Sequence, residues 1–69
     1  MGFEKIVLRK VEDVLGDSNR AEFAYGSLFV DCTEDEARSV FQRLSKDFGL
    51  GKVRVSRTFG NEFAFDFVA

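Results

Sequence analysis

The chain has 69 residues, of which 45% are hydrophobic and nine are phenylalanine, and its ten basic and twelve acidic side chains give a net charge of −2. A domain of this size buries only about 60% of the surface that its unfolded chain exposes, so we expect a single small α+β domain over residues 1–69 that gains further burial by self-association. One cysteine, Cys32, excludes an intramolecular disulfide, and the lack of histidine removes the commonest metal ligand and the commonest acid–base group. We therefore expect no enzyme, no cofactor and no metal site.

Charge and hydropathy also set expectations for partners and location. The slight acidic excess is unlike the basic balance of most nucleic-acid-binding domains, so nucleic acid is not the partner we expect first. No apolar run approaches the roughly 20 residues of a membrane-spanning helix, and the first residues lack the order of a signal peptide. We expect a soluble cytoplasmic protein with no membrane partner.

Residues 3–11 are rich in β-branched side chains, and their alternation predicts a first strand. A helix is the alternative, because short apolar runs are ambiguous by periodicity alone. Its apolar stripe would recur at helical spacing and comprise Phe3, Val7, Val11, Val14 and Leu15. Residues 12–20 include a cluster of turn formers from Gly16 to Asn19, so we expect a loop there.

Residues 21–32 are apolar at nearly every position, on both faces of a strand. This pattern predicts a central strand that is covered on both sides, or a strand that a bulge near Gly26 kinks. Phe23, Tyr25 and Phe29 would share one face. Because the chain has no histidine to activate a thiol, we interpret Cys32 as a small buried hydrophobe and not as a nucleophile.

A helix is predicted from about residue 33 to residue 48. Thr33 and Glu36 have the spacing of a capping box, in which each side chain bonds the other residue's backbone N–H. Gly49 is placed to end the helix. Apolar residues recur every three or four positions and form one stripe, namely Ala37, Val40, Phe41, Leu44 and Phe48.

The last two predicted strands form a hairpin, and two registers are open for it. Residues 53–59 alternate as a strand, and the following strand carries phenylalanine at every second position, which we call the Phe ridge (Phe63, Phe65 and Phe67). If Gly60 and Asn61 form a two-residue loop, the Phe ridge shares a face with Lys52 and Arg54. That arrangement is an aromatic platform beside basic groups, on which single-stranded nucleic acid stacks.

In the second register the loop has three residues, from Gly60 to Glu62, and Phe59 pairs with Phe63. The Phe ridge then joins Val53, Val55 and Phe59 on one face, interrupted only by Arg57. Turn chemistry favours the first register and the pattern of apolar residues favours the second. Because a one-residue slip moves every side chain to the other face, we expect apolar burial to decide for the second.

The predicted order is β-β-α-β-β, with two β-hairpins forming an antiparallel or mixed four-stranded sheet and one amphipathic helix on one face. One short helix cannot cover so many aromatic side chains. A large uncovered apolar patch on a small protein marks an interface, and self-pairing about a two-fold axis is the commonest arrangement. We therefore expect a homodimer.

Three functional hypotheses follow. The first is a small non-enzymatic protein-interaction module, homodimeric through its remaining aromatic sheet surface, whose candidate contacts are Phe23, Tyr25, Phe29, Arg57 and Phe59; aromatic residues and arginine are enriched at binding hot spots. The alternative is a single-stranded nucleic-acid-binding protein that uses Lys52, Arg54 and Arg57 beside the Phe ridge. A small phage-encoded or accessory protein that binds a host factor is a further alternative, to which the length and the lack of proline are suited.

Overall fold

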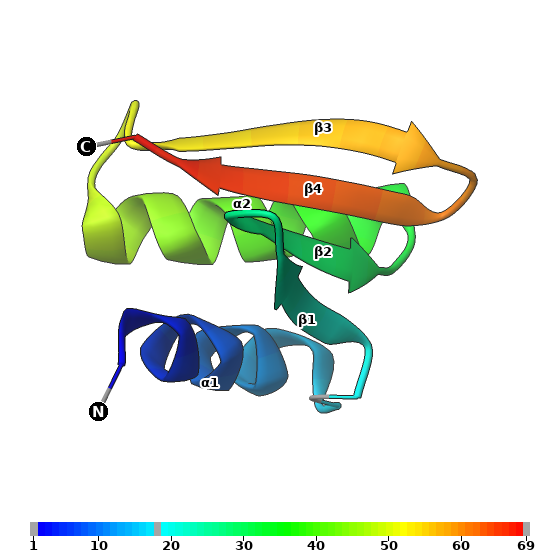
Figure 1. The fold of residues 1–69 in the computed structure, drawn as a ribbon, viewed down its shortest axis with the longest axis horizontal. Coiled ribbons are helices and arrows are strands. Elements are labelled where there is room, and N and C mark those ends of the chain that lie inside the picture. Colours follow the sequence, from blue (N-terminus) through cyan, green and yellow to red (C-terminus); the bar gives the residue numbers. More distant parts are fainter. Residues whose placement is uncertain (1, 18, 69) are drawn as a thin grey trace.

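The computed structural model describes residues 2–17 and 19–68, which form two helices and four strands (Figure 1). In chain order these are α1 (Phe3–Leu15), β1 (Ala21–Ala24), β2 (Ser27–Asp31), α2 (Glu34–Phe48), β3 (Val53–Phe59) and β4 (Glu62–Phe67). All paired strands are antiparallel, and the sheet order is β1-β2-β4-β3. The α+β class and the four-stranded sheet are confirmed, whereas two helices take the place of the single predicted helix.

The N-terminal segment is a helix, so the predicted strand over residues 3–11 is wrong. Val7 and Val11 lie one turn apart in α1 and are fully buried. Burial of this stripe outweighs the strand preference of the β-branched residues, because tertiary packing commonly overrides such local preferences. The helix ends at Gly16, whose φ of 76° favours a residue without a β-carbon and whose N–H donates to the preceding turn at 2.7 Å.

Ion pairs reinforce the contact between the two helices. Lys10 of α1 lies 2.8 Å from Asp47 of α2, and Arg43 of α2 lies 3.5 Å from Asp13 of α1. The hydrogen bond from Lys10, with a second from Arg43, lowers the pKa of the Asp47 carboxyl. These pairs lie on the side of α2 against which α1 packs.

The stretch from Ala21 to Asp31, predicted as part of one central strand, is a β-hairpin. Tyr25 and Gly26 form its two-residue turn, with φ angles of 53° and 79°. Positive φ at both positions is what a type I′ turn requires. Glycine meets this requirement freely and tyrosine rarely does, so the turn has no clear signal in the sequence. The chain reverses at this turn, so the interpretation of residues 21–32 as one strand is wrong. The sheet order places β1 at an edge of the sheet.

Helix α2 agrees with its prediction. The Thr33 hydroxyl accepts from the Glu36 N–H at 3.2 Å, and the Glu36 carboxylate accepts from the Thr33 N–H at 3.0 Å. The N–H of Gly49 donates to the Ser45 carbonyl at 2.9 Å and closes the last turn. Both ends of the helix depend on residues that are only three or four positions apart in the chain, which is why they could be predicted.

The β3–β4 hairpin combines parts of both predicted registers. Phe59 pairs with Glu62 around the two-residue loop Gly60–Asn61, as turn chemistry predicts. Thr58 has no cross-strand partner in this ladder and forms a bulge, which brings Arg57 opposite Phe63. The predicted three-residue loop is therefore wrong.

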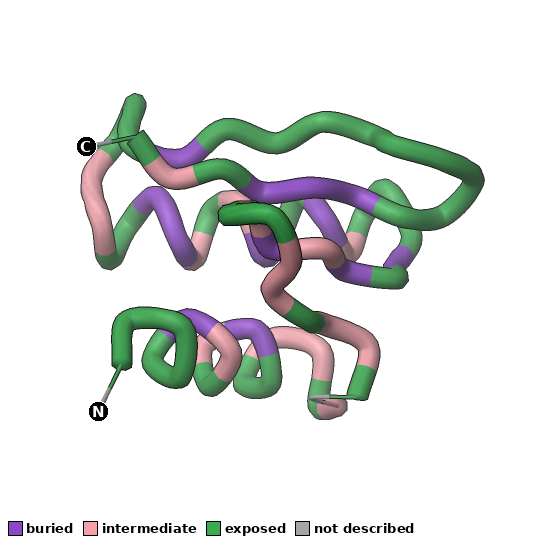
Figure 2. Tube along the Cα trace, in the orientation of Figure 1, coloured by how far each residue is buried: buried purple, intermediate pink, exposed green. Residues whose placement is uncertain are grey.

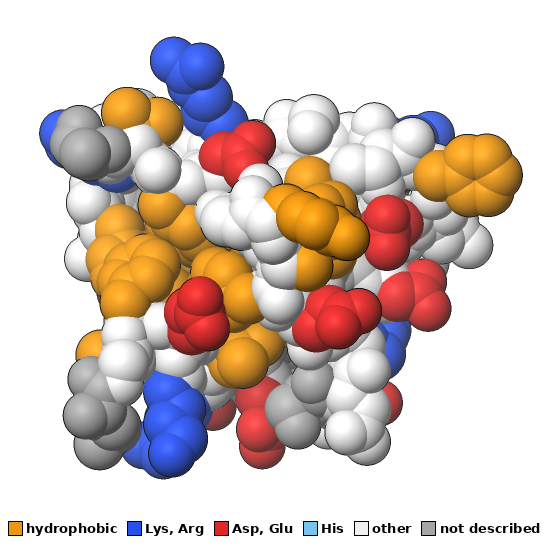
Figure 3. All heavy atoms as spheres, viewed as in Figure 1, with side chains coloured by type: hydrophobic (Ala, Val, Ile, Leu, Met, Phe, Trp, Pro, Cys, Tyr) orange, Lys and Arg blue, Asp and Glu red, His pale blue; other side chains and the backbone are white. Residues whose placement is uncertain are grey.

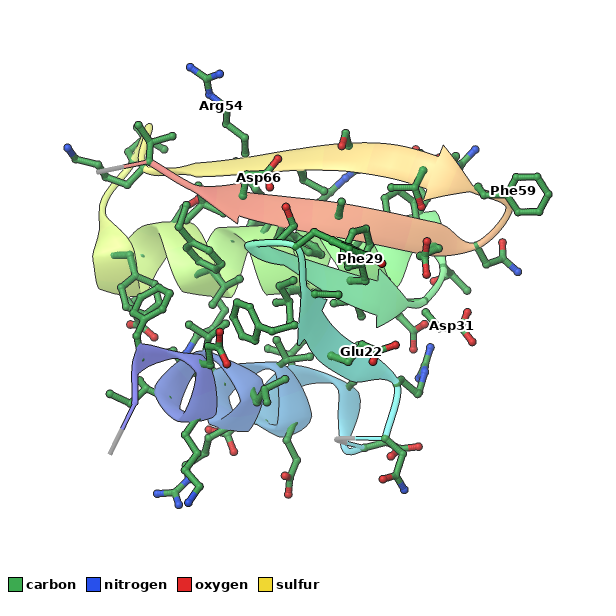
Figure 4. The ribbon with its side chains drawn as sticks, in the orientation of Figure 1. Glu22, Phe29, Asp31, Arg54, Phe59 and Asp66 are labelled. Carbon is green, nitrogen blue, oxygen red and sulfur yellow. The ribbon has the colours of Figure 1, made fainter. Side chains whose placement is uncertain are left out.

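Beyond the bulge, the pattern of apolar residues decides the faces. Val55 pairs with Phe65 and Val53 with Phe67, so the Phe ridge shares its face with these two valines, as burial predicts. Phe59 does not join this face: it lies at the tip of the hairpin and is 85% exposed (Figure 4). The expected place of Phe59 on the ridge face is a second error, caused by the bulge.

The core lies between the sheet and the helices. In Figure 1, α2 runs behind β2 and β4, and α1 lies beside it next to β1. Purple buried segments accordingly follow one side of each helix and the middle of β2 and β4 (Figure 2). The core residues come from every element except β1, namely Val7, Val11, Leu28, Val30, Cys32, Ala37, Val40, Leu44, Val53, Phe63 and Phe65.

An aromatic cluster closes one end of this core. The Phe67 ring lies 5.1 Å from Phe3, 5.9 Å from Phe48 and 6.3 Å from Phe23, measured between ring centroids. Edge and tilted contacts of this kind add to the free energy gained from burial. Phe23 therefore packs within the fold, although it was predicted from the sequence as an interface residue.

Candidate protein-interaction surface

The helices leave one face of the sheet uncovered, and we call it the open face. Cross-strand pairing sets Glu22, Phe29, Ala64 and Ser56 in one row across all four strands. Phe29 stands in the middle of the sheet and is half-buried. The full open face consists of the residues that alternate with the core positions, namely Glu22, Ala24, Ser27, Phe29, Asp31, Arg54, Ser56, Glu62, Ala64 and Asp66.

Negative charge is concentrated on the open face. Figure 4 shows Glu22, Asp31 and Asp66 around Phe29, with Arg54 at the far edge, and Figure 3 shows red acidic side chains around the orange ones in the same view. Four carboxylates and one guanidinium leave three net negative charges here, whereas the whole chain carries −2. The rest of the chain is therefore slightly positive, and the open face differs from it in sign.

A hollow of about 340 Å³ lies at one side of the open face. Its lining combines the aromatic side chain of Phe29 with acidic groups and the segment before β1, namely Asn19, Arg20, Ala21, Glu22, Asp31 and Glu62. An apolar surface with acidic groups around it can receive a side chain that is both flat and positively charged.

The segment beside this hollow is held by one ion pair. Arg20 makes two hydrogen bonds to the Glu36 carboxylate, at 2.7 and 3.3 Å, and a third to the Asp31 carbonyl at 2.8 Å. The bonds from Arg20, followed by the bond from the Thr33 backbone, lower the pKa of Glu36 to about 2. The charge of Arg20 is thus paired with Glu36, and no ion pair between described residues uses a carboxylate of the open face.

The two most prominent exposed aromatic residues lie at opposite ends of the sheet. Tyr25 is fully exposed at the β1–β2 turn, and Phe59 is exposed at the β3–β4 turn. Because Asp31 pairs with Glu62, the β3–β4 turn lies at the far end of β2 from Tyr25. Tyr25 and Phe59 therefore do not contribute to one compact patch.

Arg57 lies on the helix side of the sheet. Its guanidinium stands over the Phe63 ring, 5.1 Å from the centroid, and reaches Glu34 of α2 at 3.3 Å. It borders a groove of about 250 Å³ between α2 and β3, which we call the edge groove. The groove is lined by Glu34, Ala37, Arg38, Phe41, Val55 and Phe63.

The structure thus distributes the sequence-predicted interface residues over several places. Only Phe29 lies in the middle of the open face. For the nucleic-acid alternative, Arg54 lies on the open face, Arg57 on the helix side, and Lys52 in the loop before β3. The Phe ridge, which was to stack the bases, packs into the core, where Phe65 is fully buried.

Sequence reasoning missed the acidic groups around Phe29 and the edge groove. The acidic positions were readable in part, because Asp31 follows Phe29 by two residues and Glu62 and Asp66 alternate with the Phe ridge. Bringing them together on one face requires the β1–β2 hairpin, which was not predicted, and the pairing of β2 with β4. The edge groove joins α2 to β3, and no local pattern indicates such a contact.

Other classes of site were also considered for the described residues. Burial raises the pKa of the Cys32 thiol to about 11, so the thiol is neutral and enclosed in the core. Residues 2–17 and 19–68 contain no group of three or more cysteine, aspartate or glutamate side chains arranged to hold a metal ion. Over the same residues, no helix has both the length and the apolar character needed to cross a membrane.

Comparison with known proteins adds no assignment: no family model, no curated protein and no solved structure matches the chain. A function must therefore be inferred from the contacts and charges of the chain itself.

Proposed function

We propose that this protein is a small non-enzymatic protein-interaction module that works as a homodimer and binds a second protein through the open face. The observation that supports it most is the half-exposed Phe29 among carboxylates, on a sheet face that neither helix covers. The matching partner surface is basic and presents arginine. A guanidinium can stack on the Phe29 ring while it donates to the surrounding carboxylates.

The charge of the open face also bears on the dimer. If two copies packed open face to open face, four carboxylates of one would meet four of the other, which is strongly unfavourable. The open face is therefore better suited to a partner of opposite charge than to a second copy. The two subunits should join through a different part of the surface.

Binding of a labelled oligo-arginine peptide, followed by fluorescence anisotropy at rising salt, tests the open face. The test variant is Glu22→Gln with Asp31→Asn, which neutralises two exposed carboxylates beside Phe29. Its matched control is Glu12→Gln with Asp35→Asn, which makes the same change of charge on the exposed sides of the helices. Because exposed ion pairs contribute about 0.2–1 kcal/mol each, we expect the test variant to bind about two- to thirtyfold more weakly and the control to bind normally.

The aromatic part of the surface is tested by Phe29→Ala, which should also weaken binding of the peptide without a change of net charge. Equal losses in the test variant and in the matched control would show that net charge alone attracts the peptide, and would contradict the proposed site. A labelled single-stranded oligonucleotide measured in parallel tests the nucleic-acid alternative. Salt-dependent binding of the oligonucleotide that Arg54→Ala and Arg57→Ala abolish would favour that alternative.

A further inference from the structure

Strand β3 is a long sheet edge. It has seven residues and pairs with β4 on one side, and the sheet order places no other described strand beside it. The opposite edge, β1, has four residues and packs against α1. The outer backbone groups of a long edge strand are a template for pairing with another strand.

Features that usually protect an edge are few in β3. It contains no proline, and its bulge at Thr58 lies next to the turn, so the ladder from Val53 to Arg57 is continuous. Arg57 is paired with Glu34, and Arg54 lies opposite Asp66 in the ladder. The charge of Arg57 is therefore paired within the same chain, and Arg54 has an acidic residue opposite it on β4.

Exposed apolar side chains lie at the middle of β3 and near both of its ends. Val55, in the middle of β3, is 39% exposed above the edge groove, whose other apolar walls are Ala37, Phe41 and Phe63. Leu50, just before the strand, is 89% exposed, and Phe59, at its end, is 85% exposed. The exposed apolar side chains thus lie at the centre and at both ends of one strand, which is the self-complementary pattern that a two-fold interface needs.

We propose that two copies of this chain pair through antiparallel β3 strands about a two-fold axis at Val55, so that one eight-stranded sheet carries four helices on the same face. The inference rests on the homodimer proposed above and names the surface that forms it. Residues that are directly opposed in an antiparallel ladder point to the same face of the sheet. On β3 before the bulge, odd-numbered residues point to the helix side and even-numbered residues point to the open face. The helix sides of the two copies therefore lie on one face only if odd-numbered residues are opposed to odd-numbered residues. Pairing Val55 with Val55 of the partner subunit satisfies this condition.

The charged residues of β3 lie opposite uncharged residues in this register. Arg54 lies opposite Ser56 of the partner subunit, and Arg57 lies opposite Val53 of the partner subunit, so no like charges are directly opposed. The two edge grooves meet beside the axis. Because Phe59 and Leu50 stand at opposite ends of β3, the antiparallel arrangement brings Phe59 to the end where Leu50 of the partner subunit lies.

A stable dimer buries about 800 Å² from each partner, which is about one sixth of the 4665 Å² surface of this chain. The surface that the β3 pairing would cover comprises the outer edge of the strand, the edge groove and the two exposed apolar ends. The additional burial would stabilise a chain that, with 69 residues, can bury only a small core by itself.

Two variants of Val55 test the inference together with light scattering over a range of concentrations. Val55→Cys places two thiols opposite one another at the axis, so oxidation should give a disulfide-linked dimer, whereas Phe29→Cys on the open face should not. Native Cys32 is buried and is present equally in both variants. Val55→Lys places two like charges at the axis, and it should raise the dissociation constant of the dimer by about a hundredfold or more.

Circular dichroism checks that Val55→Lys still folds, and Val55→Cys decides the matter if it does not. A wild-type chain that stays monomeric at high micromolar concentration would overturn both the homodimer and the β3 interface. A wild-type dimer that Val55→Lys leaves intact and Val55→Cys fails to link would overturn the β3 interface alone. Peptide binding to the open face is a separate readout, because Val55 lies on the other face of the sheet.

Discussion

Replacement of Phe65 by alanine tests the register of the β3–β4 hairpin directly. Phe65 is fully buried and stands between Leu28 of β2 and Val55 of β3. Removing a buried aromatic ring costs the free energy of its transfer from water plus a term for the cavity, together about 3–5 kcal/mol. A chain of 69 residues has a free energy of unfolding of only about 3–10 kcal/mol. We therefore expect Phe65→Ala to lose most of its stability and to be partly unfolded at 25 °C.

The assay is urea unfolding followed by circular dichroism at 222 nm, with Phe59→Ala as the matched control. Phe59 belongs to the same hairpin and is 85% exposed, so its removal should change the free energy of unfolding by less than about 0.5 kcal/mol. Both variants are compared at a concentration at which light scattering shows monomers, because the proposed dimer would cover Phe59. A loss below about 1 kcal/mol for Phe65→Ala would refute the reasoning, since it would mean that the Phe ridge faces solvent.

Three further predictions concern single contacts. The pKa of Glu36 is lowered from 4.5 to about 2 by its bonds to Arg20 and to the Thr33 backbone. Its contribution to the free energy of unfolding is therefore complete above pH 4.5 and is lost as the pH falls towards 2. The stabilities of wild type and Glu36→Gln, measured against pH, should differ above that window and converge below it. The hydroxyl of Ser45 is buried in α2 and has no hydrogen-bond partner among the described residues. Ser45→Ala should therefore raise the free energy of unfolding by about 0.5–2 kcal/mol in urea titrations. A lower free energy of unfolding would show that the hydroxyl does make a hydrogen bond. Deletion of the bulge residue Thr58 should leave a cooperative thermal transition, because the loop and the remaining pairs stay compatible, whereas deletion of Ala64 should abolish it, since β4 is paired on both sides.

The parts of the fold that could be predicted are those determined by near neighbours in the chain. Helix α2 is the clearest case, because Thr33, Glu36 and Gly49 mark its ends and the apolar stripe lies between them. The segment of α1 has no such marks at its start: Gly2 provides no side-chain cap, and its valines suit a strand equally well. What decides for a helix is the burial of Val7 and Val11 in the core, which involves distant parts of the chain.

The candidate surface was predicted only in part for the same reason. Phe29 was predicted as an interface residue from the sequence, but its acidic neighbours come from β1, β2 and β4, and they meet only once the strands are in register. The register of β1 against β2 in turn depends on a turn with a tyrosine of positive φ at residue 25, and the place of Arg54 on the same face depends on a bulge at Thr58. Neither has a strong local signal, because tyrosine is uncommon in such turns and bulges follow from competing demands.

The bulge at Thr58 connects these demands to the proposed function. The two-residue loop Gly60–Asn61 alone would pair Thr58 with Phe63, and with the Phe ridge buried it would turn Arg54 and Ser56 towards α2. One extra residue restores Val53 and Val55 to the helix side, and it leaves Phe59 at the tip of the hairpin. It also puts Arg54 on the open face, in the same row as Asp66. The apolar edge of β3 and the place of Arg54 on the open face thus both depend on a single residue without a cross-strand partner. A change at Thr58 that shifts the register of β3 should therefore alter both dimerisation and the net charge of the open face.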